Sequence, residues 1–179
     1  MSEFSELLLF TKSTFTELDP GMVVIINSTN TKSNEFDGTV DHQSILAVSS
    51  GTTGEPTLWP RGLEQELEAA SVHRDLFSSL YEVDRYRTLI IIGFPMGVYV
   101  SGIATTLPTF LASLTNKNIS IITAGNSKEN ILTLIPKVQK LYQQIILVGH
   151  PFFVKDVLES GIRNNIVWSK TKLRTFFCS

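Results

Sequence analysis

The residues best suited to chemistry lie in one short segment, positions 49–57, which reads Ser-Ser-Gly-Thr-Thr-Gly-Glu-Pro-Thr. Its hydroxyl groups can donate hydrogen bonds to an anion, and its glycines let backbone N–H groups turn toward one. The segment directly follows the apolar run Ile45–Val48, so we predict a polyphosphate-binding loop in preference to an ordinary polar turn. The candidate contacts are Ser49, Ser50, Gly51, Thr52, Thr53, Gly54 and Thr57.

Other common nucleotide and metal motifs do not occur in the sequence. A Walker A loop that starts at Gly51 would need a second glycine where Pro56 stands, followed by Lys and then Ser or Thr. The sequence contains neither G-x-G-x-x-G nor H-E-x-x-H. A metal cluster is not predicted either, because the three histidines lie far apart without cysteine partners: His42, His73 and His150.

The segment 49–57 resembles the phosphate-binding signature of the adenylate-forming superfamily, which includes acyl-CoA synthetases, luciferases and non-ribosomal adenylation domains. Most members end this motif in Pro-Lys. Thr57 replaces that Lys here, which resembles the branch of phenylacetate-CoA ligases and coenzyme F390 synthetases. The resemblance is specific at 49–57 and looser over about 19–161, where Gly-Phe-Pro-Met-Gly (93–97) and Ile-Ile-Leu-Val-Gly-His-Pro-Phe-Phe (145–153) stand in family order.

The resemblance implies an α/β fold and a two-step reaction. With Mg²⁺ present, a carboxylate attacks the α-phosphorus of ATP to form an acyl-adenylate and pyrophosphate, and a thiol such as CoA then takes the acyl group. Hydrogen bonds from Ser50, Thr52 and Thr53 would hold the β- and γ-phosphates, where negative charge develops. Without a Lys at position 57 the loop supplies dipoles only. Arg61, the nearest cation, either compensates or is exposed and solvated.

Two further places are candidates for substrate contacts. The resemblance places residues 93–102 near the acyl pocket, with Phe94, Met96 and Tyr99 as candidates, although such side chains also suit a core. His150 directly follows an apolar run, and open α/β sheets bind ligands beyond the carboxyl ends of their strands. Because Pro follows it, His150 could instead only mark the start of a helix.

The apolar pattern predicts the elements that position these residues. Short apolar runs predict strands at 22–26, 45–48, 89–92, 119–122 and 145–148. Helical periodicity predicts a helix over 63–81 with one apolar side formed by Leu63, Leu67, Ala70, Phe77 and Tyr81. A second helix is predicted over 127–142, capped by Asn126 or Ser127 with help from Glu129 and kinked at Pro136. A third is predicted over 151–160 and stops at Gly161. Alternating strands and helices predict a largely parallel sheet flanked by helices.

Composition bounds the remaining possibilities. The 179 residues correspond to about one domain, which we divide into a partial AMP-binding domain at 1–168 and a basic tail at 169–179. Residues 1–87 hold 6 Lys and Arg against 14 Asp and Glu, and residues 88–179 hold 9 against 3, but the cations are too sparse to predict nucleic-acid binding. Positions 88–116 carry no charge, yet several Gly and Pro residues interrupt them, so a strand at 89–92, a Gly- and Pro-containing loop and then a buried helix are preferred to a membrane span. The single cysteine, Cys178, and the acidic N-terminus favour the cytoplasm.

The motifs that the sequence lacks separate three hypotheses. It contains no Tyr-Gly-x-Thr-Glu, whose Glu holds Mg²⁺ in the family, and no ribose-binding Thr-Gly-Asp. We expect first a truncated or partial acyl- or aryl-CoA ligase that binds nucleotide and a small carboxylic acid but is inactive alone. The second is a non-catalytic nucleotide- or acyl-binding module, or one half of an enzyme completed by another chain or copy. The third is an unrelated α/β domain.

Overall fold

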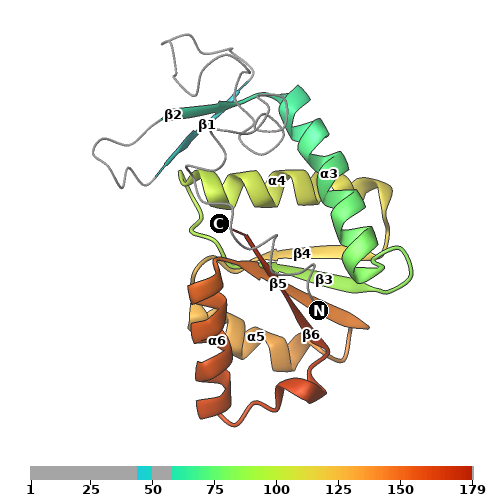
Figure 1. The fold of residues 1–179 in the computed structure, drawn as a ribbon, viewed down its shortest axis with the longest axis vertical. Coiled ribbons are helices and arrows are strands. Elements are labelled where there is room, and N and C mark those ends of the chain that lie inside the picture. Colours follow the sequence, from blue (N-terminus) through green and yellow to red (C-terminus); the bar gives the residue numbers. More distant parts are fainter. Residues whose placement is uncertain (1–43, 50–57, 179) are drawn as a thin grey trace, which may run out of the picture.

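The computed structural model describes residues 44–49 and 58–178 (Figure 1). The predicted strand at 22–26 and the loop residues 50–57 lie outside the described residues. In chain order, the elements are β1 (Ile45–Val48), β2 (Leu58–Arg61), α3 (Leu63–Tyr81), β3 (Thr88–Ile92), α4 (Val100–Thr115), β4 (Ile119–Thr123), α5 (Lys128–Val138), β5 (Gln144–Gly149), α6 (Pro151–Arg163), the 3₁₀ helix η1 (Trp168–Lys170) and β6 (Leu173–Phe177).

Four strands form one parallel sheet in the order β4-β3-β5-β6. β3 is central, and its Ile90 stands opposite Ile121 of β4 and Ile146 of β5. Every residue of β3 and of β5 is buried, which explains why both strands carry unbroken apolar runs. The predicted α/β fold with a parallel sheet is therefore confirmed, as are the strands at 89–92, 119–122 and 145–148.

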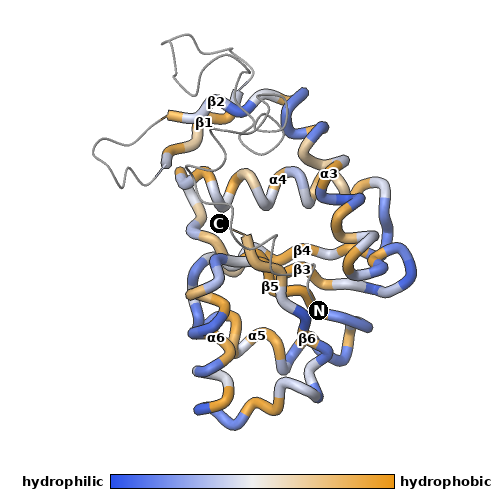
Figure 2. The backbone as a smooth tube through the Cα atoms, viewed as in Figure 1, coloured by the Kyte–Doolittle hydropathy of each residue, from blue (hydrophilic) through white to orange (hydrophobic). Residues whose placement is uncertain are grey.

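Helices cover both faces of this sheet, and a hydrophobic cluster lies on each. Figure 1 shows α3 and α4 on one side and α5 and α6 on the other, and Figure 2 shows that β3, β4 and β5 between them are strongly apolar. The α3-side cluster contains Phe77, Tyr81, Val83, Ile90, Ile92, Phe94, Ile119, Ile146 and Val148. The α5–α6-side cluster contains Leu89, Ile91, Ile131, Ile135, Ile145, Leu147, Val154 and Val157.

The helix predicted over 63–81 is confirmed, but its inward face differs at the first turns. Leu63 and Leu67 are 62% and 53% exposed, whereas Glu66 is buried. Ala70, Phe77 and Tyr81 are buried and do face inward as expected. Among the described residues, the α3 side chains that belong to a hydrophobic cluster are Phe77 and Tyr81, which both lie in the second half of the helix.

Helix α5 is shorter than predicted. It ends at Val138, four residues before the expected end at 142. Pro136 lies in the last turn and has no N–H to donate, which weakens continuation of the helix. Ser127 is the N-cap and its hydroxyl accepts a hydrogen bond from the Asn130 N–H over 3.4 Å, so Asn130, and not Glu129, stands at the capping-box position.

Helix α6 is longer than predicted, because it continues past Gly161 to Arg163. The left-handed residue that ends it is Asn165, with φ 60°, after which the Ile166 N–H donates to the Gly161 carbonyl over 2.9 Å. Gly161 therefore lies inside the helix. Its lack of a side chain serves packing, since a Cβ there would come within 2.0 Å of the Trp168 ring.

The segment predicted as a basic tail belongs to the fold. Leu173–Phe177 form β6, which pairs in parallel with β5 at the edge of the sheet. Phe176 packs against the α3-side cluster, and the Tyr81 hydroxyl donates a hydrogen bond to the Thr175 carbonyl over 2.8 Å. The interpretation of 169–179 as a tail is therefore wrong for these residues.

The uncharged stretch 88–116 folds as strand β3, a connecting loop and helix α4. Among the described residues, no helix combines the length and the apolar character that crossing a bilayer requires.

Candidate functional site

The predicted phosphate loop joins two antiparallel strands. β1 pairs with β2 in a register that runs from Ile45 opposite Arg61 to Val48 opposite Leu58, which confirms the strand at 45–48. Residues 49–57 therefore connect the strands of a hairpin, and a strand follows them where a Walker A loop would lead into a helix. Donors for a phosphate would thus come from hydroxyls and N–H groups of the loop itself. Only Ser49 of the loop candidates lies within the described residues.

The loop end of the hairpin meets the predicted substrate segment. The N–H of Val48 donates a hydrogen bond to the carbonyl oxygen of Val98 over 2.7 Å, and Val48 forms a parallel β-bridge with Tyr99. Because Ser49 directly follows Val48, the start of the segment 49–57 lies next to residues 98 and 99. The fold has thus brought together two candidate segments that are far apart in the sequence.

The three aromatic and Met candidates of this segment have different surroundings. Phe94 is 6% exposed and belongs to the α3-side cluster, which fits its alternative role as a core residue. Met96 is partly buried, and its side chain lies close to both Gly102 and Gly125. Tyr99 is the N-cap residue of α4 and is 45% exposed. Of the three, Tyr99 is the side chain most open to a ligand.

The loop between β3 and α4 runs close against the helix that follows it. A Cβ on Gly102 would come within 2.2 Å of the Pro95 carbonyl oxygen, which is backbone and cannot move aside as a side chain could. Gly102 is therefore required by close approach. This contact holds residues 95–99, and so the partner of Val48, against the first turn of α4.

His150 stands at the carboxyl end of β5, next to the end of β3. The two strands pair, and the Gly93 N–H donates to the Val148 carbonyl over 2.8 Å. From β3 the chain continues to β4 on one side of the sheet and then to β5 and β6 on the other side. Open α/β sheets form ligand crevices where the strand order changes side in this way, here between β3 and β5. His150 is exposed, is the N-cap residue of α6, and lies against the ring of Phe152 with 5.5 Å between ring centroids. Its position thus fits both a ligand contact and the start of a helix.

Arg61 is not the exposed, solvated cation that the sequence suggested. It is 4% exposed, and its Nε donates a short hydrogen bond to Oε1 of Glu66, which is 1% exposed. The two form a buried ion pair between the end of β2 and the first turn of α3. The Nε of Arg61 is therefore committed to Glu66.

A half-buried histidine lies on the same face of α3. His73 Nδ1 is 2.9 Å from the hydroxyl oxygen of Thr109 on α4. That hydroxyl donates its proton to the Thr105 carbonyl over 2.6 Å, so His73 Nδ1 carries the hydrogen that it donates to Thr109. Burial, and secondarily the positive charge of Arg61, lowers the pKa of His73 to about 4. His73 is thus neutral at neutral pH and joins the two helices.

Sequence reasoning missed Glu66 and His73 as inward-facing residues. Both share a face with Ala70 and Phe77, because positions 66, 70, 73 and 77 recur at the spacing of three or four that marks one side of a helix. Polar residues at such positions look like interruptions when only apolar residues are counted. The repeat itself was the available signal.

Within the described residues, no group of three His, Cys, Asp or Glu side chains is placed to hold a metal ion. No protein-family model and no curated protein matches this sequence.

Proposed function

We propose that this chain provides the phosphate-binding loop and part of the substrate site of an ATP-dependent, adenylate-forming acid–thiol ligase. The observation that supports this best is the contact of Val48 with Val98 and Tyr99. Adenylation is a reaction between two bound substrates, so their sites have to be adjacent. A hairpin that brings the loop 49–57 to the segment 93–102 meets that requirement.

In this proposal the two segments have separate tasks. Residues Ser50, Thr52 and Thr53 donate hydrogen bonds to the β- and γ-phosphates of ATP, and the glycines at 51 and 54 let the backbone follow them. The carboxylic acid lies on the side of Tyr99. Its oxygen forms a bond to the α-phosphorus while the bond to the leaving pyrophosphate breaks, and the loop stabilises the charge that develops on pyrophosphate. CoA would be the acceptor of the acyl group in the second step.

We propose further that these residues bind nucleotide without completing adenylation. The sequence contains neither Tyr-Gly-x-Thr-Glu nor Thr-Gly-Asp, and the described residues hold no acidic cluster for a cation. We therefore assign no ligand to Mg²⁺. In this proposal these groups come from outside the residues described, and the protein acts in the cytoplasm.

A non-catalytic module that binds nucleotide or pyrophosphate is the second candidate. The presence of Thr57 where most of the superfamily has Lys favours it, since hydroxyls and N–H groups bind phosphate without supplying a full charge. Both candidates require that the loop bind phosphate groups. They differ in whether the carboxylic acid matters.

Calorimetric titration with ATP and with pyrophosphate tests the shared requirement. We expect binding by the wild-type chain and a loss of about tenfold or more for Gly51→Val and for Thr53→Val, which remove backbone freedom and a donor. Thr123→Val, at the exposed end of β4, is the matched control and should bind as the wild type does. Unchanged affinity of the two loop variants would contradict the assignment.

An exchange assay separates the candidates. With a panel of aryl and acyl acids, we expect no ATP–pyrophosphate exchange by the chain alone, and tighter ATP binding in the presence of a cognate acid if the ligase proposal is right. Robust exchange by the chain alone would show that the site is complete.

A further inference from the structure

We propose that Arg61 and Glu66 are a positioning pair for the loop 49–57. The side chains are 3% and 2% exposed, and the Arg61 Nε donates to Glu66 Oε1. Their role as an anchor of the β1–β2 hairpin follows from the structure. The consequence for nucleotide affinity rests on the proposed function of the loop.

The hairpin has little hydrophobic attachment to the rest of the molecule. Neither of the two hydrophobic clusters of the described residues contains a residue of β1 or β2. Ile45, Leu46 and Leu58 are all more than 40% exposed, and Ala47 is the buried apolar residue of the hairpin. Among the described residues, polar contacts are therefore an important part of what holds the hairpin in place.

Two such contacts lie at opposite ends of the hairpin. At the loop end, the Val48 N–H is bound to the Val98 carbonyl. At the base, Arg61 stands opposite Ile45 in the pairing register and reaches across the connection to Glu66. One contact alone would act as a pivot, whereas two contacts at separate ends fix the orientation of β1 and β2, the strands that flank residues 49–57.

The helix that carries Glu66 is itself firmly placed. At its start, the Gly62 N–H donates to the side-chain oxygen of Gln65 over 3.1 Å, which closes the turn between β2 and α3. Farther along, His73 is bound to Thr109 of α4, and Phe77 is buried in the α3-side cluster. The ion pair therefore connects β2 to a helix that is fixed to the core.

The charge on Glu66 makes the pair an effective anchor. Its second carboxylate oxygen, Oε2, is buried and has no hydrogen-bond partner among the described residues. Separation from Arg61 would therefore leave a buried carboxylate that is poorly satisfied, which is strongly unfavourable. When the ion pair is absent, the hairpin moves and water reaches the buried group that has lost its partner, which reduces this penalty. The affinity for nucleotide then falls in proportion to the fraction of molecules with the hairpin docked.

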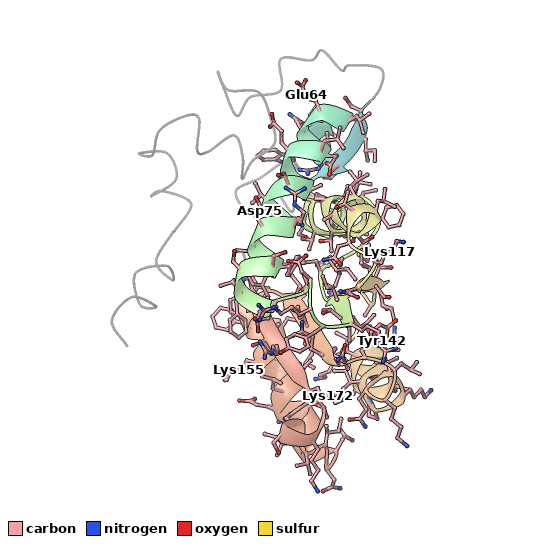
Figure 3. All side chains as sticks on the ribbon, turned by 90° about the vertical axis from the view of Figure 1, so that its right-hand side faces the viewer. Glu64, Asp75, Lys117, Tyr142, Lys155 and Lys172 are labelled. Atoms are coloured by element: carbon pink, nitrogen blue, oxygen red, sulfur yellow. The ribbon has the colours of Figure 1, made fainter. Side chains whose placement is uncertain are left out.

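The experiment compares Glu66→Gln with Asp156→Asn. The control residue forms an ion pair with Lys128 over 2.7 Å, and both substitutions replace a carboxylate by its amide. Asp156 follows Lys155 in α6. Figure 3 shows that Lys155 lies far from Glu64, which is at the start of α3. Both variants are first shown to be folded by circular dichroism and urea titration.

For folded Glu66→Gln we expect the Kd for ATP to rise about tenfold, or about 1.4 kcal/mol, while Asp156→Asn stays within about twofold of the wild type. The amides of residues 45–48 and of Leu58, Trp59 and Arg61 should exchange hydrogen faster in Glu66→Gln only. Glu66→Asp, which keeps the charge, should recover part of the affinity. If Glu66→Asp recovers affinity for ATP without a matching recovery of stability in urea, the loss in Glu66→Gln comes from the position of the hairpin and not from general destabilisation.

Two results would overturn the proposal. One is a folded Glu66→Gln variant with wild-type Kd for ATP. The other is unchanged hydrogen exchange at 45–48 and 58–61. If the wild-type chain binds neither ATP nor pyrophosphate, the proposed function fails by itself, and the exchange measurement still decides whether Arg61 and Glu66 anchor the hairpin.

Discussion

Trp168 lies so close to Gly161 that a Cβ on the glycine would come within 2.0 Å of the Trp168 Cζ2 atom. The indole is held there because its Nε1 donates a hydrogen bond to the Leu158 carbonyl over 2.8 Å. The contact therefore connects the last turns of α6 with η1, which leads into the edge strand β6.

Gly161→Ala should destabilise the chain. Alanine is the better helix former by about 1 kcal/mol, but overpacking against a fixed ring costs about 1–3 kcal/mol, and the short contact makes the second effect the larger. We expect a net loss of up to about 2 kcal/mol in the free energy of unfolding, measured by urea titration. Gly62→Ala is the control, because a Cβ there meets nothing within 4 Å. Equal stability of Gly161→Ala and the wild type would contradict the packing.

The stability of the fold should decrease in acid because of His73. Its pKa is about 4 in the folded chain and 6.5 in the absence of a shift, so the unfolded chain takes up a proton between these values and the folded chain does not. Stability is lost as the pH falls from 6.5 to 4, by about 3 kcal/mol in total, and does not depend on this group at higher pH.

His73→Asn tests this dependence with urea titrations across that pH range. Asn keeps a donor for the Thr109 hydroxyl but does not titrate, so the loss between pH 6.5 and 4 should become smaller. The same substitution at His150, which is exposed, should leave the wild-type dependence in place. A dependence that His73→Asn does not alter would assign the acid sensitivity to other groups.

The only cysteine of the sequence should react slowly in the folded chain. Burial raises the pKa of Cys178 from 9.0 to about 11. Because the thiolate is the reactive form, the rate with a disulfide reagent at pH 8 should be about a hundredfold lower in the folded chain than in urea. Stopped-flow measurement of both rates checks this. Similar rates would show that Cys178 is not packed beside the α3-side cluster.

Two neighbouring phenylalanines test whether β6 belongs to the sheet. Phe176 packs against Phe77 with 5.8 Å between ring centroids, whereas Phe177 is 46% exposed. We expect Phe176→Ala to reduce the free energy of unfolding by about 2–3 kcal/mol, since Phe176 is only partly buried, and Phe177→Ala to have a smaller effect. Urea titration measures both. If neither variant changed the stability, the segment would behave as the tail that its composition suggested.

The central strands and α3 could be predicted because their signals are local. An unbroken run such as Ile145–Val148 suits a strand that is buried on both faces, whatever its neighbours are. The strand β6 was missed because an edge strand alternates, and Arg174 and Thr175 hide its apolar residues. The ends of α5 and α6 were misplaced because caps depend on single residues such as Asn165.

The candidate site divides in the same way. Residues 49–57 were singled out from their types and order alone, because hydroxyls and glycines in succession are a local pattern. No local pattern shows that Val48 binds Val98, or that Arg61 is buried against Glu66.

By itself, the sequence determined an α/β fold and predicted a phosphate-binding loop at 49–57. Only the tertiary structure decided what adjoins that loop, how the hairpin is held and which charges are buried. The physical reason is that periodicity and composition report how each segment meets water. Contacts between distant segments depend on how the helices and the sheet pack together.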